Sequence, residues 1–413
     1  MKNNFFLRSF LSIVFLLFCA CHAPVPGKKD DVKDSLFQKG EFGFDLSFLK
    51  KKDSTLILLH SGDAQVVVSP KYQAKVFTST SSGEHGPSFG WINYKAFGDS
   101  LNAHMNAYGG ENRIWLGPEG GKFSLFFKPG ASMVFENWKT PAAFDTEGWD
   151  LRSHNDSIVV LSKETILKNY TGFELDILIV RSIRILDEAE ISNRMGVTAP
   201  DSIQVVGYET TNELTNRGNK EWTNSTGMPC IWILDMLRPS SSTVIVVPFR
   251  KSEPGFQEAV TSNYFGDISP DRLRHNDSLL FFKADGNSRG KLGIAPAYAV
   301  PKACSYDPQL QVLTVVFFDL DTSGSYLNQQ WNTKVPAFSG DAVNAYNDGP
   351  LADGSRMGPF YELESVSPAA FLKPGASLVH KHSVFHFSGS KKQMDRISKK
   401  LLGIPLKNIS SAF

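Results

Sequence analysis

Short apolar runs with strand-like alternation recur along most of the chain and predict a mostly β protein. Each run is rich in Val, Ile and Phe and is bounded by Gly, Pro, Asn, Asp or Ser, as strands between turns are. Many strands at close spacing indicate a sandwich or a barrel rather than alternating strands and helices. The predicted strands are Ala64–Ser69, Lys75–Thr80, Lys122–Phe127, Ser157–Leu161, Phe173–Arg184, Ser242–Phe249, Leu279–Lys283, Gln311–Asp319 and Leu378–Phe387.

Helical periodicity is rare. Gly43–Lys51 predicts one or two turns, and Lys391–Leu402 predicts a longer helix with apolar residues at helical spacing. The length allows one large domain or two. Because there is no fixed-period repeat and no Pro- and Ser-rich internal linker, we favour one large all-β domain over residues 36–413.

The N-terminus has the pattern of an export signal. Lys2 and Arg8 precede an apolar run, Phe10–Phe18. Such a run has the length of a signal-peptide core, about 7–15 residues, and is too short to span a bilayer. We therefore predict that residues 1–20 are removed from the mature protein.

The end of this segment indicates a lipoprotein. Ala20 stands directly before Cys21, which resembles the bacterial lipobox and predicts a lipid anchor on Cys21. Modification of Cys19 and an ordinary cleaved signal are the alternatives. The polar residues 21–35 read as a tether, and the expected location is the cell envelope, on the periplasmic side or at the cell surface.

Charge and cysteine content narrow the function classes. The chain has 43 basic and 42 acidic residues, so no basic field supports nucleic-acid binding. Cys230 and Cys304 could form one disulfide or remain two buried thiols. No Cys-x-x-Cys, phosphate loop or Gly-x-Ser-x-Gly occurs, and we predict no cofactor and no metal.

Three histidines need separate consideration because they share one face of the last predicted strand. His380, His382 and His386 have even spacing. Only the nearer pair, His380 and His382, is close enough to share a metal ion. A solvated or structural role is therefore favoured over a metal site.

The segment from residue 104 to residue 121 has the most unusual composition. His104, Asn112, Arg113, Trp115 and Glu119 stand here among several glycines. Glycines allow sharp turns and close approach of the backbone to a ligand. An aromatic face beside a planar guanidinium suits a sugar, which offers C–H faces and hydroxyls. The alternative is a structural β-loop with Arg113 and Glu119 paired.

A second polar segment follows the apolar run Ile203–Val206. It contains Asn212 and Glu213, which we expect near a strand end, where a cleft can form. Since Asn and Gly also favour turns, a plain hairpin is the alternative.

A third segment places two carboxylates together. If Phe360–Ser365 is a strand, Glu362 and Glu364 share one face. Adjacent carboxylates repel, which can raise the pKa of one of them and suit it to act as a base. An outward, solvated pair is the alternative.

The order of these segments resembles the galactose mutarotase-like superfamily, which includes the aldose 1-epimerases, over roughly Asp45–Phe387. The chain also looks like a group of uncharacterised lipoproteins in that superfamily, with its His-Met-Asn and Trp-Leu-Gly-Pro-Glu-Gly-Gly segments. The resemblance implies a β-supersandwich, two large twisted antiparallel sheets with a site on a concave face. It is carried by Asn112-Arg113-Ile114, Gly121-Lys122-Phe123, Phe144-Asp145 with Trp149, Thr211-Asn212-Glu213, Leu363-Glu364-Ser365 and Leu372-Lys373-Pro374-Gly375.

The chain departs from the epimerase pattern where the family has histidines. Glu213 stands at the position of the general acid, and Thr140–Ala143 contains no histidine. The resemblance therefore implies a two-carboxylate site, with Glu213 as acid and Glu364 as base, whose geometry would also suit glycosidic bond cleavage. The expected substrate-binding residues are His104, Asn112, Arg113, Trp115, Glu119, Asn212 and Glu362.

Three functions remain open on the sequence. The first is an envelope-anchored, carbohydrate-active enzyme. The second is a non-catalytic lipoprotein that captures glycans for partner enzymes, and the third is a structural envelope protein on a reused scaffold. Catalysis is favoured if Glu213 and Glu364 face each other across one pocket at about 5–10 Å, a spacing that glycosidases use.

Overall fold

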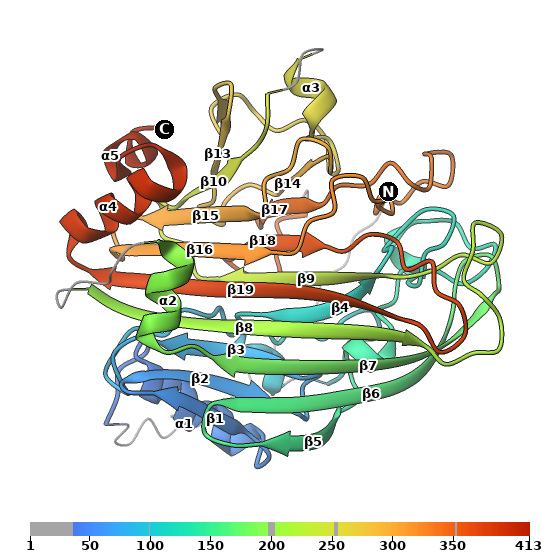
Figure 1. Ribbon diagram of the computed structural model, residues 1–413, viewed down its shortest axis with the longest axis horizontal. Coiled ribbons are helices and arrows are strands. Elements are labelled where there is room, and N and C mark those ends of the chain that lie inside the picture. The colour runs from blue at the N-terminus through green and yellow to red at the C-terminus, as the bar shows by residue number, and fades with distance from the viewer. Residues whose placement is uncertain (1–35, 99, 197–202, 252–254, 352) are drawn as a thin grey trace, which may run out of the picture. The chain divides into compact units, whose positions relative to one another are not determined.

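The computed structural model describes residues 36–98, 100–196, 203–251, 255–351 and 353–413 (Figure 1). Phe37–Phe413 form one unit. The predicted signal peptide, the predicted lipidation site Cys21 and the predicted tether all lie outside the described residues. Within the described part, no helix is long and apolar enough to cross a membrane.

Two large antiparallel sheets dominate the unit, and a small three-stranded sheet accompanies them (Figure 1). In sheet order, the ten-stranded sheet contains β12 (Leu273–His275), β13 (Leu279–Lys283), β10 (Val244–Pro248), β15 (Lys302–Asp307), β16 (Val312–Phe318), β19 (Ser377–Gly389), β8 (Ile203–Asn216), β7 (Glu174–Ile185), β6 (Ile158–Lys168) and β5 (Asp150–His154). The six-stranded sheet contains β11 (Val260–Thr261), β14 (Gly290–Ile294), β17 (Val343–Asn347), β18 (Tyr361–Val366), β9 (Cys230–Leu237) and β4 (Arg113–Gly117). The small sheet contains β1 (Ile57–Ser61), β2 (Ala64–Ser69) and β3 (Lys75–Thr80).

Helices are few and short, as predicted. They are α1 (Phe42–Lys52), α2 (Glu188–Met195), α3 (Phe256–Ala259), α4 (Lys391–Leu402), α5 (Leu406–Ser410) and the 3₁₀ turns η1 (Tyr94–Phe97), η2 (Phe135–Asn137) and η3 (Ala142–Phe144). Helix α4 has the predicted bounds. Helix α2 was not predicted; it begins with a capping box in which the side chains of Asp187 and Glu190 accept hydrogen bonds from each other's backbone N–H groups.

The predicted all-β architecture of large antiparallel sheets is confirmed, and every predicted strand is present except Lys122–Phe127. That prediction is wrong. Residues 122–127 follow a turn in which Ser124 N–H donates to Gly121 O, and Leu125 N–H donates to Pro118 O. The phenyl groups of this segment are buried, but its backbone pairs with scattered positions and not with a neighbouring strand, since Tyr170 N–H donates to Ser124 O and Lys139 N–H donates to Phe126 O.

Asn212 and Glu213 lie four and three residues before the end of β8, within the strand and not in a hairpin turn. β8 runs for 14 residues and pairs with β19 and β7 along both edges, so the two residues lie inside the sheet. The segment contains Asn and Gly, which also favour turns. Pairing with both neighbouring strands overrides that local preference. Asn212 is buried and Glu213 is partly exposed, because neighbouring side chains point to opposite faces.

A buried arginine connects the two large sheets. Arg181 of β7 donates from Nε to the carbonyl of Ala74 at 3.0 Å and from Nη1 to Asn212 Oδ1 at 2.6 Å. Its Nη2 donates to Asn112 Oδ1, in the residue that precedes β4. Asn112 in turn donates from Nδ2 to Asp235 Oδ1 of β9 at 2.5 Å. All of these polar groups are therefore satisfied without water, as a closely packed sandwich requires.

The histidines of β19 continue this polar layer. His382 contacts Asp235 Oδ2 through Nε2 at 2.8 Å and Ser365 Oγ through Nδ1 at 2.8 Å. The same hydroxyl contacts His380 Nε2 at 2.8 Å. His386 contacts Glu111 through Nε2 at 3.0 Å. His380 and His382 thus connect the two large sheets, and His386 contacts the segment before β4. The described residues contain no group of three or more His, Cys, Asp or Glu arranged around a metal ion.

The two cysteines of the domain are free and buried. Cys230 begins β9 and Cys304 lies in β15, so they belong to different sheets. Of the two alternatives, the structure has two thiols. Burial raises the pKa of both to about 12, which makes them unreactive at neutral pH.

Replacement of Arg181 tests the importance of the polar layer. We expect Arg181→Met to lower the free energy of unfolding by about 3 kcal/mol or more, because three buried acceptors lose their donor. The matched control is Arg184→Met on the same strand, where Arg184 pairs with the half-exposed Glu190. That change should cost less than about 1 kcal/mol. Urea unfolding measures the stability of both variants. If Arg181→Met and Arg184→Met unfold at the same urea concentration, the role of Arg181 is contradicted.

Candidate functional site

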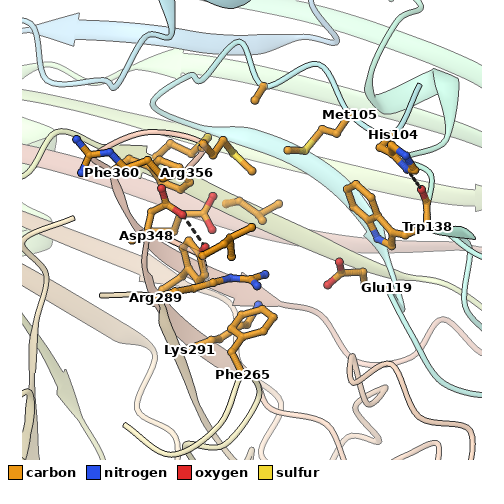
Figure 2. Close-up of a pocket in the computed structure, with 18 of the residues that line it drawn as sticks. His104, Met105, Glu119, Trp138, Phe265, Arg289, Lys291, Asp348, Arg356 and Phe360 are labelled. Carbon is orange, nitrogen blue, oxygen red and sulfur yellow. Dashed lines mark hydrogen bonds between the residues drawn. The ribbon is translucent and has the colours of Figure 1, made fainter. Parts of the chain in front are cut away.

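A pocket of about 470 Å³ lies on the face of the six-stranded sheet that points away from the ten-stranded sheet (Figure 2). Side chains at alternate positions of each strand line it. Their neighbours in sequence, such as Asp235 and Ser365, point to the other face and join the polar layer. The residues on the pocket face are Arg113 and Trp115 of β4, Trp232, Leu234 and Met236 of β9, Glu362 and Glu364 of β18, Tyr346 of β17 and Lys291 of β14.

Two crossed ion pairs form the floor of the pocket. Strand register places Arg113 in the same cross-strand row as Glu364, and it places Lys291 in the next row together with Glu362. Each cation reaches diagonally into the other row. Arg113 Nη2 lies 2.5 Å from Glu362 Oε1, and Lys291 Nζ lies 2.8 Å from Glu364 Oε2. Diagonal neighbours on one face of a sheet are within reach of long side chains.

Glu364 is held firmly but retains a free acceptor. Its Oε2 accepts from Trp232 Nε1 at 2.8 Å as well as from Lys291. Its Oε1 is buried and has no hydrogen-bond partner among the described residues. An unpaired buried oxygen of this kind is costly unless a ligand donates to it.

Burial and the neighbouring cations act in opposite directions on the pKa of Glu362. Burial raises the pKa of Glu362 to about 7, and the neighbouring carboxylates Glu364 and Asp348 act in the same direction. Arg113 and Lys291 oppose this shift in pKa but do not cancel it. The group can therefore change its protonation state near neutral pH, as general acids and bases do.

A further carboxylate approaches from a different wall. Glu119 follows β4, and its side chain points into the pocket (Figure 2). Its backbone N–H donates to Gln329 Oε1 at 2.6 Å, which fixes the position of the residue. Burial raises the pKa of Glu119, and the charge of Glu364 adds to the rise, while Lys291 lowers it. The charges of Glu119 and Glu364 are thus close enough to interact across the pocket.

Tryptophans form much of the apolar lining. Trp115 and Trp232 meet edge to face at 5.6 Å between ring centroids. Arg113 lies 5.1 Å from the centre of the Trp115 ring, and Lys291 lies 4.6 Å from the centre of Trp232. These contacts hold both cations above aromatic faces and add to their ion pairs.

Most of the residues predicted from the segment 104–121 and from the strand at 360–365 meet in this pocket. His104 belongs to the lining, where its Nδ1 lies 2.6 Å from the carbonyl oxygen of Trp138. Arg113 pairs with Glu362 rather than with Glu119. The residues that the pocket brings together are His104, Arg113, Trp115, Glu119, Glu362 and Glu364.

Three predicted site residues lie elsewhere. Asn112 and Asn212 bind Arg181 inside the polar layer. Glu213 is on the opposite face of β8 from Asn212 and does not line the pocket. The structure therefore does not bring Glu213 and Glu364 together.

Several lining residues were not predicted from the sequence. Lys291, Arg289 and Asp348 come from β14 and from the residues that flank β14 and β17, and Trp138 and Trp331 come from loops. Even spacing on a single strand identified Glu362 and Glu364. No such local signal exists for Lys291, because it meets Glu364 only through the pairing of β14, β17 and β18.

Comparisons with known proteins give one family match. A family model described as "Family of unknown function (DUF6786)" matches residues 40–413. No curated protein matches the chain.

Several solved structures are similar at low identity. A putative aldose 1-epimerase from Escherichia coli K12 is 15% identical, with 80% of this chain and 98% of that chain covered and a TM-score of 0.46. The Slr1438 protein from Synechocystis sp. PCC 6803 is 13% identical, with 81% and 96% covered and a TM-score of 0.49. A galactose mutarotase-like protein from Lactobacillus casei ATCC 334 is 12% identical, with 80% and 99% covered and a TM-score of 0.46.

The raised pKa of Glu362 predicts a pH dependence of stability. An ordinary glutamate has a pKa of 4.5, and Glu362 has about 7, so the folded state holds a proton that the unfolded state releases. The free energy of unfolding should therefore fall as the pH rises from about 4.5 through about 7. Glu362→Gln keeps a neutral side chain and should lack this part of the fall. Thermal melts from about pH 5 to about pH 8 measure it.

The control for this experiment is Glu188→Gln, on the exposed surface of α2. Its melting temperature should follow the pH profile of the unmodified protein. If the profile of Glu362→Gln also runs parallel to that of the unmodified protein, Glu362 does not titrate in this range.

Proposed function

We propose that this chain, which belongs to the DUF6786 family, is a carbohydrate-active protein that binds a sugar in the pocket of the six-stranded sheet and performs acid–base chemistry on it. The observation that carries this proposal is the pair of buried carboxylates, Glu362 and Glu364, on the floor of an aromatic pocket. The resemblance of the surrounding segments to aldose 1-epimerases agrees with it.

Unpaired polar atoms support a ligand that both donates and accepts hydrogen bonds. Glu364 Oε1 is a buried acceptor without a partner among the described residues, and Arg113 Nε and Trp138 Nε1 are buried donors without one. A sugar hydroxyl can serve either kind of group. The C–H faces of the sugar ring would pack on Trp115 or Trp232, which line the same floor.

In this proposal, Glu364 acts as the base and Glu119 as the acid. Glu364 is fixed by Lys291 and Trp232, and its free oxygen can accept a proton from a sugar hydroxyl. Burial raises the pKa of Glu119, which favours the protonated form needed to donate a proton from the other wall. Glu362 has a pKa of about 7 and can exchange protons with either step. Glu213, which the sequence favoured as the acid, has no such position.

A binding function without catalysis is the second candidate. Arg113 and Lys291 each pair with a floor carboxylate, and such pairs can position sugar hydroxyls without any proton transfer. An anchored protein of this kind would present glycans to neighbouring enzymes in the cell envelope.

Anchoring is part of the proposal and rests on the sequence alone. The positive residues, the apolar run and the Ala20-Cys21 pair support export followed by lipid attachment to Cys21. The mature protein would then hold its sugar site close to the membrane surface, on a polar tether.

The catalytic proposal predicts a specific pattern of variants. The purified protein is first screened by thermal shift against monosaccharides and glycan fragments, because a ligand that binds only the native state raises Tm. With a ligand that is turned over, Glu364→Gln and Glu119→Gln should each lower kcat by about 10²–10⁴-fold. Glu213→Gln is the matched control and should retain full activity.

The outcomes separate the candidates. Binding that depends on Arg113 but without turnover would favour the capture function. Equal loss of activity in Glu213→Gln and Glu364→Gln would contradict the assignment of the site to this pocket. No binding across the panel would exclude small free sugars as ligands.

The anchor gives an independent prediction. When the full chain is expressed in bacteria fed with a clickable fatty acid, Cys21→Ala should abolish incorporation of the lipid, and Cys19→Ala should retain it. Label that persists in Cys21→Ala would contradict the assignment of the lipidation site.

A further inference from the structure

Large apolar side chains are exposed at the rim of the pocket. Phe135 is 58% exposed and Phe265 is 43% exposed, and both belong to the lining. Leu351 and Met357, at 45% and 40%, line it as well. A group of exposed apolar side chains around one cavity indicates a binding surface, since single exposed residues are normally scattered.

The rim differs in chemistry from the floor. On the floor, each cation has a carboxylate partner, and Arg113 Nε and Glu364 Oε1 are buried without a hydrogen-bond partner among the described residues. On one side of the rim, aromatic rings stand nearly parallel. His104 and Phe135 stack at 4.6 Å, Phe135 and Trp138 at 6.1 Å, and Trp138 and Trp331 at 6.1 Å between centroids. The pocket thus has an ionic end and an apolar, flat-sided end.

The other side of the rim is also aromatic and is held in place. Arg289 lies 3.8 Å from the centre of the Phe265 ring, and Phe265 meets Tyr346 edge to face at 6.0 Å. Figure 2 shows Phe265 with Arg289 and the His104–Trp138 pair on opposite sides of the pocket. Aromatic rings therefore line two sides of the same pocket.

We infer that the rim is a subsite for an apolar, flat substituent on the sugar, so that the ligand is a glycoside with an aromatic or polycyclic aglycone. This inference rests on the proposed function, because it places the sugar on the ionic floor. A free sugar would leave Phe135 and Phe265 in water. An aglycone would cover them, and aromatic groups prefer such stacked or edge-on contacts.

The pocket volume agrees with a ligand of this size. About 470 Å³ lies within the range of cavities that bury drug-sized molecules, roughly 300–1,000 Å³. Because the exposed rings line the same cavity as the carboxylates, one bound molecule can contact both. This continuity favours an aglycone over a membrane surface as the occupant of the rim.

The test compares matched ligands by isothermal titration calorimetry on the purified protein. Methyl and 4-nitrophenyl glycosides of the same sugars are titrated, together with 4-nitrophenol alone. For at least one sugar, we expect the 4-nitrophenyl glycoside to bind about tenfold or more tightly than the methyl glycoside. Phe135→Ser and Phe265→Ser should each remove most of this gain and leave the affinity for the methyl glycoside within about twofold.

The control variant is Phe371→Ser. Phe371 is 46% exposed, like the rim residues, but does not line the pocket. The gain should persist in this variant. If the gain is lost here as well, the effect is not local to the rim and the inference is overturned.

Other outcomes distinguish failure of the inference from failure of the proposed function. Methyl and 4-nitrophenyl glycosides that bind equally would overturn the aglycone subsite and leave the sugar site intact. If 4-nitrophenol binds as tightly as its glycosides, or if no glycoside binds, both proposals fail. Binding to phosphatidylcholine vesicles that Phe135→Ser abolishes, without any gain for aryl glycosides, would identify the rim as a membrane contact and overturn the inference.

Discussion

The guanidinium of Arg181 has to be satisfied between two β-sheets, and much of the domain is arranged around that requirement. Each of its three nitrogens donates a hydrogen bond, to Ala74, Asn112 and Asn212. A buried charge without such partners would cost several kcal/mol. Because these partners come from the ten-stranded sheet and from segments that lead into β3 and β4, the bonds fix how the two layers meet.

The same polar layer fixes the pocket, because its residues adjoin the pocket residues in sequence. Asn112 precedes Arg113, Asp235 stands between Leu234 and Met236, and Ser365 follows Glu364. Side chains alternate along a strand, so hydrogen bonds on the inner face set the register of the outer face. The geometry of the pocket floor therefore depends on the hydrogen bonds of the polar layer, which lie on the opposite face of the sheet.

This dependence explains what the sequence could and could not predict. Two-residue periodicity places Glu362 and Glu364 on one face, and local composition identifies the segment with Arg113 and Trp115. The pairing of Lys291 with Glu364 depends on three strands that come together only in the fold. The sequence did not show on which face Glu213 lies, because a polar stretch that resembles a hairpin is part of a long strand, paired with neighbours on both sides.

The two ion pairs on the pocket floor, Arg113–Glu362 and Lys291–Glu364, help to distinguish a catalytic site from a site that only binds a sugar. Burial of Glu362 and Glu364 with their cations carries a desolvation cost that neutral amides would avoid, and neutral amides can also hydrogen-bond a sugar. A carboxylate, unlike an amide, can also accept and release a proton. The pKa of about 7 at Glu362 and the unpaired oxygen of Glu364 are properties of that kind. Buried charge is therefore easier to explain in a site that transfers protons than in one that only holds a glycan.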